Sequence, residues 1–475
     1  MADNARPFRV AVAGSGIAGL AVAIALKQHP GIRVDLYERA TQLREIGASI
    51  ALGPNGMRTL DRLGVANALV DAADDAANGL SFRNVSGYPM VYRHYKTGEV
   101  VSTDASQADK NILKRHWTAR YYRAHLQESL AAHVDPQQIH LSKAFSSVAW
   151  DPAKGELVLS FADGSTAAAD LLVGADGLHS RVRTFFVPAS RPQWTGALAL
   201  RSVFPRAHVA HIEGLPHEAT HVWGHDRTLF FSPLGRDLYT VVGQVQYDPA
   251  EDTAAPGGAG GPDLKDLRDT AKAWASDGSV ETLRGLYAGW GSLVKNLVNA
   301  VPHTELYPNS SSDSLPTWVL SGTTANVPAG RVTLVGDAAH AHGGAFATGG
   351  SLALDDAWAF AAALLHVFPP AAAAAAATAQ PSTADLLHAV HIYEKTRKGH
   401  TDRLLRIVHA SNQARVESLR ASLRPGYVPE TDQQLRARIR NRTDATWLHE
   451  HDVQASFAAA VREVERGGPV EQSRL

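Results

Sequence analysis

Three glycines near the beginning of the chain have the spacing of a phosphate-binding turn. Gly14, Gly16 and Gly19 occur in the segment GSGIAG. In such a turn the first glycine permits a sharp bend, the second lets the backbone approach a pyrophosphate, and the third lets a helix pack closely on a strand. An acidic residue, Glu38, follows about 20 residues later, where a carboxylate can accept hydrogen bonds from ribose hydroxyls. These residues suit a cofactor that contains ADP.

The neighbouring residues predict the strand, helix and strand that would hold this turn in place. The apolar run 10–13 precedes the glycines, apolar residues then recur at helical spacing, and a second strand over 34–37 leads to Glu38. A lone glycine motif is weak evidence, because glycine turns are often purely structural, but here all of these features agree. We therefore predict that NAD or FAD binds here. The charge of Glu38 would repel the 2′-phosphate of NADP.

Two segments downstream could also contact a flat cofactor. Residues 47–51 are small and apolar, so their backbone could lie against a ring, although a tight turn into a helix at Pro54 explains them equally well. Arg123 lies in a predicted helix over 116–134 but off its apolar face. On this evidence alone, Arg123 is simply a surface charge.

Two aspartates follow predicted buried strands. Asp176 comes after a predicted hairpin over 157–174, and Asp337 comes after a strand over 331–335. A carboxylate at the end of a strand can accept hydrogen bonds from cofactor hydroxyls. The glycines and alanines over 343–350 would let backbone amides approach a ring. A helix that begins there would direct its positive end toward a negatively charged ligand.

An antiparallel sheet is predicted over 196–247, where residues alternate and aromatics are frequent. Such a sheet could form a roof over a ligand, with Arg201 and Tyr239 as its polar contacts. In the alternative interpretation Arg201 pairs with a carboxylate on the sheet surface and Tyr239 is a core aromatic. Another antiparallel strand pair is predicted over 80–93, and helices over 264–298.

Composition excludes several classes of function. The 475 residues can form two or three domains, and 46 basic against 47 acidic residues leave no surface typical of nucleic-acid binding or a polybasic membrane patch. The chain has no cysteine, which excludes disulfides and thiolate chemistry. His340 and His342 form the most obvious metal-binding pair, but no third ligand has recognisable spacing, so we expect no metal site. Without a signal sequence or an apolar span, a cytoplasmic protein is expected.

Taken together, three segments resemble the single-component FAD-dependent aromatic monooxygenases of the salicylate and para-hydroxybenzoate hydroxylase type. They are the glycine turn with Glu38, the segment GADGLHSRVR with Asp176, and the segment LVGDAAHAHGG with Asp337. Arg123 matches a helix arginine that lies near the flavin pyrophosphate in that family. The resemblance covers roughly residues 8–410. It implies FAD contacts at Gly14, Gly16, Ala18, Gly19, Glu38, Arg39, Ala51, Arg123, Asp176, Asp337, Gly349 and Gly350.

The third segment departs from the usual family pattern. Where the family has proline, Gly-Gln-Gly and asparagine, this chain has Gly344, the triplet Ala-Thr-Gly at 347–349, and Ser351. The variant resembles a fungal branch of polyketide pathways, whose members hydroxylate and dearomatise resorcinol-type rings. In that branch an arginine and a tyrosine of the substrate sheet hold the phenol. The resemblance thus implies catalytic roles for Arg201 and Tyr239.

The implied fold is α/β, with a discontinuous Rossmann-type domain that binds FAD, an inserted antiparallel-sheet substrate domain and a C-terminal helical region. The predicted bounds are 1–79, 112–190 and 318–368 for the FAD domain, 80–111 and 191–317 for the substrate domain, 369–385 for an Ala/Pro-rich insertion, and 386–475 for the helical region.

The implied reaction is hydroxylation of a phenolic, polyketide-like ring through a C4a-hydroperoxyflavin, with or without dearomatisation. It would consume O2 and either NADH or NADPH, which would bind transiently because the sequence has no second glycine turn. Salicylate-type hydroxylation with decarboxylation is one alternative, and a flavin reductase or sensor that does not oxygenate is another. The protein would act as a monomer or a homodimer.

Overall fold

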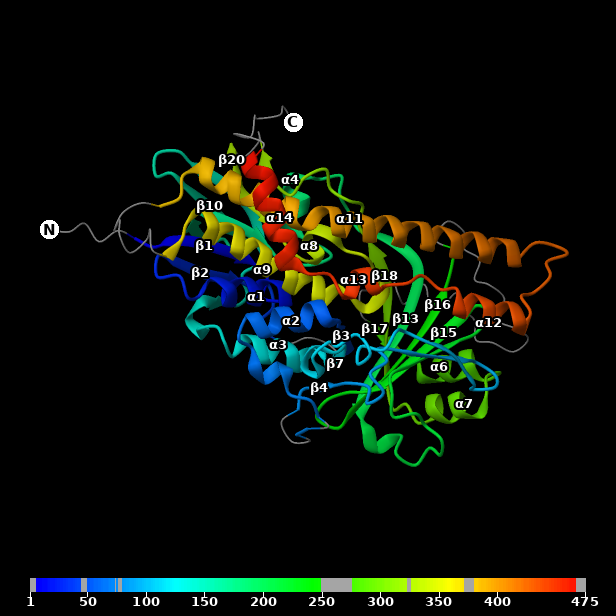
Figure 1. The fold of residues 1–475 in the computed structure, drawn as a ribbon. Coiled ribbons are helices and arrows are strands. Elements are labelled where there is room, and N and C mark those ends of the chain that lie inside the picture. Colours follow the sequence, from blue (N-terminus) through cyan, green and yellow to red (C-terminus); the bar gives the residue numbers. More distant parts are fainter. Residues whose placement is uncertain are drawn as a thin grey trace.

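The computed structural model describes residues 6–43, 49–72, 74–75, 79–248, 276–322, 326–370 and 380–466. One half of the molecule is built on a mainly parallel sheet, and the other half on a large antiparallel sheet (Figure 1). The long helix α11 runs along both halves.

The mainly parallel sheet brings together strands from distant parts of the chain. Its strands are, in spatial order, β19 (Leu320–Gly322), β20 (Val327–Leu334), β12 (Leu171–Gly174), β1 (Phe8–Ala13), β2 (Ile32–Tyr37) and β8 (Ile139–His140). Only β19 is antiparallel to its neighbour. Ala13 is in register with Gly174, and Gly174 with Leu334, so the carboxyl ends of β1, β12 and β20 lie side by side. The three motif segments begin at these ends.

Helices surround this sheet. The helix α1 (Ile17–Leu26) is apolar on all sides and nearly completely buried, as expected for a helix packed between layers. It packs against α9 (Gly349–Val367), which in turn packs against α2 (Pro54–Arg62) and α11 (Thr383–Ser422). The remaining helices of this half are α3 (Arg123–Ala131), α4 (Arg181–Phe186), α8 (Asp337–His340), α13 (Thr446–His449) and α14 (Val453–Arg466).

Two small sheets flank the parallel sheet. One consists of β3 (Ser49–Leu52), β7 (Ala119–Tyr122) and β4 (Ser81–Phe82), and the other of β9 (Phe145–Asp151), β10 (Glu156–Phe161) and β11 (Thr166–Ala169). Short 3-10 helices lie at η1 (Ala66–Leu69), η2 (Lys114–His116), η3 (Pro136–Gln138), η4 (Arg206–His208) and η5 (Ala345–Ala347).

The antiparallel half contains an eight-stranded sheet. Its strand order is β17 (Ser276–Gly278), β18 (Thr304–Ser311), β13 (Gln193–Pro205), β16 (Leu238–Gln246), β15 (Arg227–Pro233), β14 (Thr220–Trp223), β5 (Val91–His94) and β6 (Val100–Thr103). Helices α6 (Val280–Tyr287) and α7 (Ser292–Asn299) lie on the outer face of this sheet, and α12 (Asp432–Arg440) lies near its far edge (Figure 1).

The two faces of the large sheet have different coverings. On the outer face, a Cβ added at Gly243 would lie 2.9 Å from the hydroxyl of Tyr287 in α6. On the inner face, the hydroxyl of Thr240 donates to that of Ser49 in β3 at 3.0 Å. Since side chains alternate along a strand, odd-numbered residues of β16 face the helices and even-numbered ones face the first half of the molecule.

The long helix α11 connects the two halves. It begins with a capping box formed by Ser382 and Asp385. The hydroxyl of Tyr393 donates to the carbonyl of Leu334 in β20, and about seven turns later Arg420 forms an ion pair with the buried Asp248.

The structure confirms the βαβ unit, the antiparallel sheet and the helical C-terminal region, but four local predictions are wrong. Within the segment 264–298, predicted to be helical, residues 276–278 form strand β17. The segment 116–134 is not one helix, because residues 119–122 form the central strand of a small sheet. Strands β4 and β5 do not pair with each other but join different sheets. The hairpin partner of β10 is β11, whereas the apolar strand β12 enters the parallel sheet.

The predictions for residues 249–275 and 371–379, which include most of the alanine-rich insertion, lie outside the described residues. Among the helices that the structure describes, none combines the length and apolar character needed to cross a membrane.

Candidate active site

The glycine turn meets the second motif at the ends of β1 and β12. Gly14 has φ +102°, and a Cβ there would lie 2.5 Å from the carbonyl oxygen of Ala175. A Cβ at Gly19 would lie 2.0 Å from the carbonyl oxygen of Gly14. Glycine is therefore sterically required at both positions. At Gly16, in contrast, a Cβ would meet no atom within 4 Å, so the protein leaves open space beside this residue.

The predicted ribose ligand Glu38 holds the turn. One oxygen of its carboxylate accepts from the backbone N–H of Ser15 and the other from that of Ala40, both at 2.9 Å. The adjacent Arg39 is exposed. Burial of His179 in the second motif lowers the pKa of that histidine, and the positive charge of Arg39 lowers it further. Arg39 therefore faces this motif across the end of the sheet.

The carboxylate of Asp176 binds the first backbone N–H groups of helix α4, which begins at Arg181. This carboxylate accepts from the hydroxyl of Ser180 at 2.5 Å and from the backbone N–H groups of Arg181 at 2.7 Å and Val182 at 3.1 Å. Burial raises the pKa of Asp176, and these hydrogen bonds oppose the rise. The aspartate thereby sets the shape of the loop between β12 and α4.

Arg183 links the second and third motifs, and the sequence analysis missed this role. Its side chain is completely buried and donates to the carbonyls of Leu178 at 2.5 Å, Asp337 at 3.2 Å and Ala338 at 2.9 Å. An arginine between the apolar residues Val182 and Phe185 was the available signal, because a buried guanidinium needs several acceptors.

Asp337 begins the helix α8, and its side chain is exposed at the mouth of the motif loops. The preceding Gly336 has φ +61°, and its N–H donates to the carboxylate of Asp356 at 2.9 Å. Asp356 is fully buried and also contacts His340 at 2.5 Å and Arg397 at 2.8 Å. Burial opposes ionisation, but His340 and Arg397 hold the pKa of Asp356 well below its ordinary value. An ionised aspartate thus fixes the backbone of the third motif.

The loop before α9 adopts an unusual backbone. Gly343, Gly344, Phe346 and Ala347 all have φ between +50° and +73°. Proline cannot adopt such an angle. This explains why the chain has Gly344 at the position where the aromatic monooxygenases that it resembles have proline. The helix α9 begins at Gly349 as predicted.

The residues that begin this helix pack tightly. A Cβ at Gly350 would lie 2.7 Å from Ile50 and 2.8 Å from Leu52, so β3 lies directly against the start of α9. Ala18 packs on the other side of this region, 3.1 Å from a Cβ placed at Gly336. Ala51, between Ile50 and Leu52, points to the opposite face of β3, toward the large sheet.

Arg201 lies on the inner face of the large sheet. Its guanidinium donates to the side-chain carbonyl of Asn309 at 3.3 Å and lies 5.0 Å from the ring centroid of Tyr307. It is also 3.6 Å from a Cβ placed at Gly344, in the loop before α9. Burial lowers the pKa of Arg201, and the charge of Arg123 adds to this effect. The structure therefore brings Arg201, Arg123 and the third motif together.

Tyr239, in contrast, is not beside Arg201. In the register of β13 and β16, Arg201 is opposite Val242 and Phe204 is opposite Tyr239, so the two predicted catalytic residues point to opposite faces. Tyr239 is 1% exposed and packs with Phe204 and Phe231 in the core beneath α6. This placement corrects the predicted pair and agrees with the alternative interpretation of Tyr239 as a core aromatic. Tyr307 is the tyrosine that contacts Arg201.

A sequence model of the family described as FAD binding domain matches residues 8–249. The chain belongs to this family of FAD-dependent aromatic monooxygenases. Salicylate hydroxylase from Pseudomonas putida is 26% identical, over 98% of this chain and 98% of its own length. 6-Hydroxynicotinate 3-monooxygenase from Bordetella bronchiseptica is 28% identical, over 84% of this chain and 90% of its own. The FAD-dependent monooxygenase SAT7 from Stachybotrys chartarum is 31% identical, over 76% and 75% respectively.

The fold of this monooxygenase also occurs among solved structures. A salicylate hydroxylase in complex with its substrate superposes with a TM-score of 0.68 and 23% identity, covering 98% of this chain and 99% of that one. The α/β fold with several sheets and a helical C-terminal region is thus confirmed.

The geometry of the motif loops fits FAD, the cofactor of the family. The open space at Gly16 leaves room for a pyrophosphate, and the exposed carboxylate of Asp337 is available to accept hydrogen bonds. We predict that Glu38 holds the adenosine ribose, Arg123 the pyrophosphate, and Asp337 the ribitol. The predicted contacts at Arg39, Ala51, Asp176, Gly349 and Gly350 lie around the same junction of loops.

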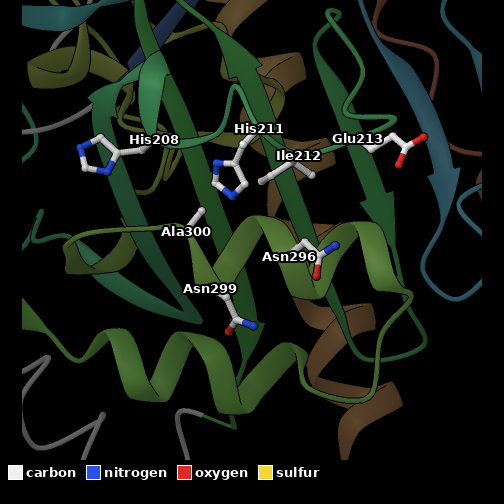
Figure 2. A pocket seen from close by; sticks show the side chains of 7 residues that line it. All are labelled: His208, His211, Ile212, Glu213, Asn296, Asn299 and Ala300. Atoms are coloured by element: carbon white, nitrogen blue, oxygen red, sulfur yellow. The ribbon is translucent and has the colours of Figure 1, made fainter.

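A separate groove of about 670 Å3 lies on the outside of the monooxygenase, between α7 and the loop that follows β13 (Figure 2). His208, His211 and Glu213 from the loop line this groove together with Asn296 and Asn299 of α7. None of the predicted cofactor or substrate residues lines it. Within the described part of the chain, no group of three or more histidine, cysteine, aspartate or glutamate side chains could hold a metal ion.

Proposed function

We propose that this monooxygenase hydroxylates a phenolic ring and consumes O2 and NADH or NADPH. The observation that carries the proposal is Arg201. Its side chain faces inward from the large sheet, beside the loop that leads into α9, and in the described residues it contacts an amide and an aromatic ring but no carboxylate. A cation in such a position favours an anionic partner, and a phenolate is the anion that an aromatic hydroxylase has to stabilise.

The protein supplies orientation and charge. FAD, when bound, supplies the chemistry of oxygen activation. Arg201 would hold the substrate oxygen in its deprotonated form, which makes the ring electron-rich. Burial lowers the pKa of Arg201, so an anion next to it would restore a stable cation. The inner face of the sheet and the loop 343–348 flank this position, and Arg201 itself is only partly exposed.

Tyr307 is the second polar residue of this position. Its hydroxyl donates to the carboxylate of Glu305, two residues earlier on β18. Burial, followed by Glu305, raises the pKa of Tyr307 far above its ordinary value, so its phenol stays protonated. Tyr307 therefore remains neutral beside Arg201 and does not compete with a substrate phenolate for the positive charge.

The substrate class is proposed from the resemblance of the third motif segment. We propose a polyketide-like phenol, with or without dearomatisation, and keep salicylate-type hydroxylation with decarboxylation as the second candidate. The second candidate is supported by relatives that are named salicylate hydroxylase and, in Aspergillus terreus, 6-methylsalicylate 1-monooxygenase. Release of CO2 from a hydroxybenzoate would distinguish the second candidate from the first.

The test combines purified holoenzyme, NADH or NADPH, O2 and a panel of phenols, resorcinols and hydroxybenzoates. We expect at least one compound to accelerate nicotinamide oxidation and to yield a product heavier by one oxygen atom, or one in which oxygen has replaced the carboxyl group. Oxidation without an oxygenated product would show a flavin reductase instead and would refute the proposal.

A further inference from the structure

A second arginine, Arg120, faces the large sheet from the small sheet β3–β7–β4. It lies on β7 directly opposite Ala51 of β3, and directly opposite residues of paired strands share a face. Ser49 is on this same face and accepts a hydrogen bond from Thr240 on the inner face of the large sheet. The guanidinium of Arg120 correspondingly lies 5.9 Å from the ring centroid of Phe230, on strand β15 of that sheet.

One row of residues crosses the large sheet from Arg201 to Phe230, the residue whose ring Arg120 contacts. Arg201 is opposite Val242, and Val242 is opposite Phe230. Neighbouring strands are about 4.8 Å apart, so the row from Arg201 to Phe230 spans about 10 Å. This length suits a single aromatic ring with a polar group at each end.

The surface between the two arginines is apolar and incompletely covered. Val242 and Phe230 remain partly exposed although they lie on central strands. Their neighbours Val241, Leu229 and Phe231, which face the opposite layer, are completely buried. Protein atoms therefore fill the outer face of this part of the sheet but leave the inner face accessible to a ring.

Arg120 lacks the partners that a buried guanidinium requires. It is 3% exposed, its Nη2 donates to the carbonyl of Pro89, and its Nε and Nη1 are buried without an acceptor among the described residues. Burial lowers the pKa of Arg120 to about 10, opposed only by Asp104 and Tyr92 at longer range. Asp104 itself pairs with Arg442 at 2.6 Å.

Arg83 shows what a structural arginine looks like in this protein. It is also 3% exposed, but it pairs with Asp71 at 3.0 Å and donates to Ser81 and to the carbonyls of Leu69 and Arg115. An uncompensated buried charge such as Arg120 is strongly destabilising unless something else neutralises it. This contrast indicates a ligand at Arg120.

We propose that Arg120 binds an acidic substituent of the aromatic substrate, a carboxylate, while Arg201 binds its phenolate. The proposal rests on the proposed function for the part played by Arg201. The substrate would lie on Val242 and Phe230, and displacement of the Phe230 ring would open Nε and Nη1 to the carboxylate. Arg120 is thus a residue that determines substrate specificity.

The test uses matched ligands that differ in one charge, namely hydroxybenzoates and the corresponding hydroxybenzamides. Their dissociation constants are measured on the holoenzyme from changes in flavin absorbance. The unaltered enzyme should prefer the acids. Arg120→Gln should weaken binding of the acids about 10- to 100-fold, the range expected for a charge-assisted hydrogen bond, and leave binding of the amides unchanged. Arg120→Lys should keep part of the preference because it keeps the charge but loses the planar fork.

Arg93→Gln is the matched control. Arg93 is a partly buried arginine on β5 of the large sheet with a single carbonyl acceptor, Gly98, but it is opposite Val222, whose side chain lies in the core under α6. This variant should change neither acid nor amide binding.

Thermal unfolding provides a second readout. Without ligand, Arg120→Gln should melt at the same or a higher temperature, since it removes an uncompensated charge. A lower melting temperature with an unchanged ratio of acid to amide affinity would show a structural arginine and overturn the proposal, and so would an unaltered enzyme without preference for acids. If Arg120→Gln does not fold, the Arg120→Lys variant decides by the same ratio. Failure of the proposed function is seen separately, as the absence of an oxygenated product from every compound.

Discussion

At the scale of single residues, two arginines lie against the inner face of the large sheet and form no ion pair with a carboxylate among the described residues. Arg201 contacts Asn309 and Tyr307, and Arg120 contacts the carbonyl of Pro89. Elsewhere the buried cations Arg83 and Arg397 are paired with aspartates. Positive charge is therefore concentrated where the substrate of an aromatic hydroxylase would bind.

Arg201→Gln should reduce turnover at neutral pH about 100-fold while FAD stays bound, since a charge-assisted hydrogen bond contributes roughly 1.5–3 kcal/mol. Raising the pH toward the pKa of a simple phenol, about 10, should reduce the deficit, because solvent then deprotonates the substrate. Steady-state rates from pH 7 to 10 check this. Turnover near that of the unaltered enzyme at pH 7 would exclude Arg201 from catalysis.

Tyr239→Phe should leave turnover unchanged. The hydroxyl of Tyr239 is buried without a hydrogen-bond partner among the described residues, and burial raises its pKa far above the ordinary value. Removing an unsatisfied buried hydroxyl is neutral or stabilising, so we expect the melting temperature to stay the same or to rise slightly. A loss of turnover as large as that of Arg201→Gln would contradict the placement of Tyr239 in the core.

At the scale of elements, the cofactor loops are fixed by buried polar side chains that reach from one element to another. Arg183 in α4 binds the carbonyls that begin α8, and Asp356 in α9 binds the N–H of Gly336 and pairs with Arg397 of α11. Each of these contacts joins segments that are far apart in the sequence. Hydrogen bonds within the protein therefore help to determine the shape of these loops.

Arg183→Met should weaken FAD binding by about tenfold or more, because it leaves three carbonyls of the motif loops without their donor, and loss of the donor to the buried carbonyl of Ala338 alone costs roughly 1–3 kcal/mol. Flavin fluorescence titration of the apoprotein measures the dissociation constant. Arg331→Met is the control, since Arg331 also donates to a buried carbonyl, that of Asp170, but away from the motif loops. Equal effects of the two variants on FAD affinity would refute the link.

Asp356→Asn should destabilise the protein by about 3–5 kcal/mol at neutral pH, as expected when one partner of a buried ion pair is removed. The pKa of Asp356 is lowered in the folded state, so its contribution is fully present above its ordinary pKa of about 4 and is lost as the pH falls through the folded value. The difference from the unaltered protein should thus be constant from about pH 6 to 8 and shrink below about pH 4.

The neighbouring Asp355 provides the control, because its contribution to stability should change with pH in the opposite direction. Chemical denaturation of both variants across this pH range measures the two effects. Burial raises the pKa of Asp355, so its contribution is present at low pH and is lost as the pH rises through the folded value. Asp355→Asn should therefore resemble the unaltered protein at low pH, where Asp355 is protonated, and become the more stable of the two as the pH rises. Identical pH profiles for the two variants would contradict the assigned charge states.

At the scale of the whole molecule, α11 holds the two halves together. Its first part packs on β20 and α9, and its last turns reach the end of β16 through Arg420 and Asp248 (Figure 1). Asp248 is buried, whereas Arg420 is partly exposed. The position of the substrate sheet over the cofactor half therefore depends in part on one ion pair at the end of a 40-residue helix.

Arg420→Ala should lower the free energy of unfolding by about 2 kcal/mol, because it removes the ion-pair partner of a buried carboxylate. Arg424→Ala, close by and exposed, should have an effect within about 0.5 kcal/mol. Urea denaturation of both variants measures the difference. An effect of Arg420→Ala no larger than that of Arg424→Ala would show that the pair does not hold the helix.

The sequence by itself determined the features that depend on neighbouring residues. The steric demand on Gly19 and the positive φ of Gly14 belong to one strand–turn–helix unit, so the glycine spacing was sufficient to predict the unit and its nucleotide-binding role. The close approach of Ala175 to Gly14 comes instead from a distant strand. The start of α9 at Gly349 and the order of the three motifs could be read in the same way. Together they predicted the family.

Only the tertiary structure decided which distant residues meet and which face each one occupies. Tyr239 lies beneath α6 and Arg201 toward the cofactor half because the pairing of β13 with β16 sets the face of every side chain, and a local pattern does not contain that register. Residues 119–122 have helical periodicity but form a strand, since β3 and β4 pair with them from both sides. Other segments of the chain provide acceptors for Arg183 but leave two nitrogens of Arg120 without one among the described residues. Neither role could therefore be recognised before the positions of those segments were known.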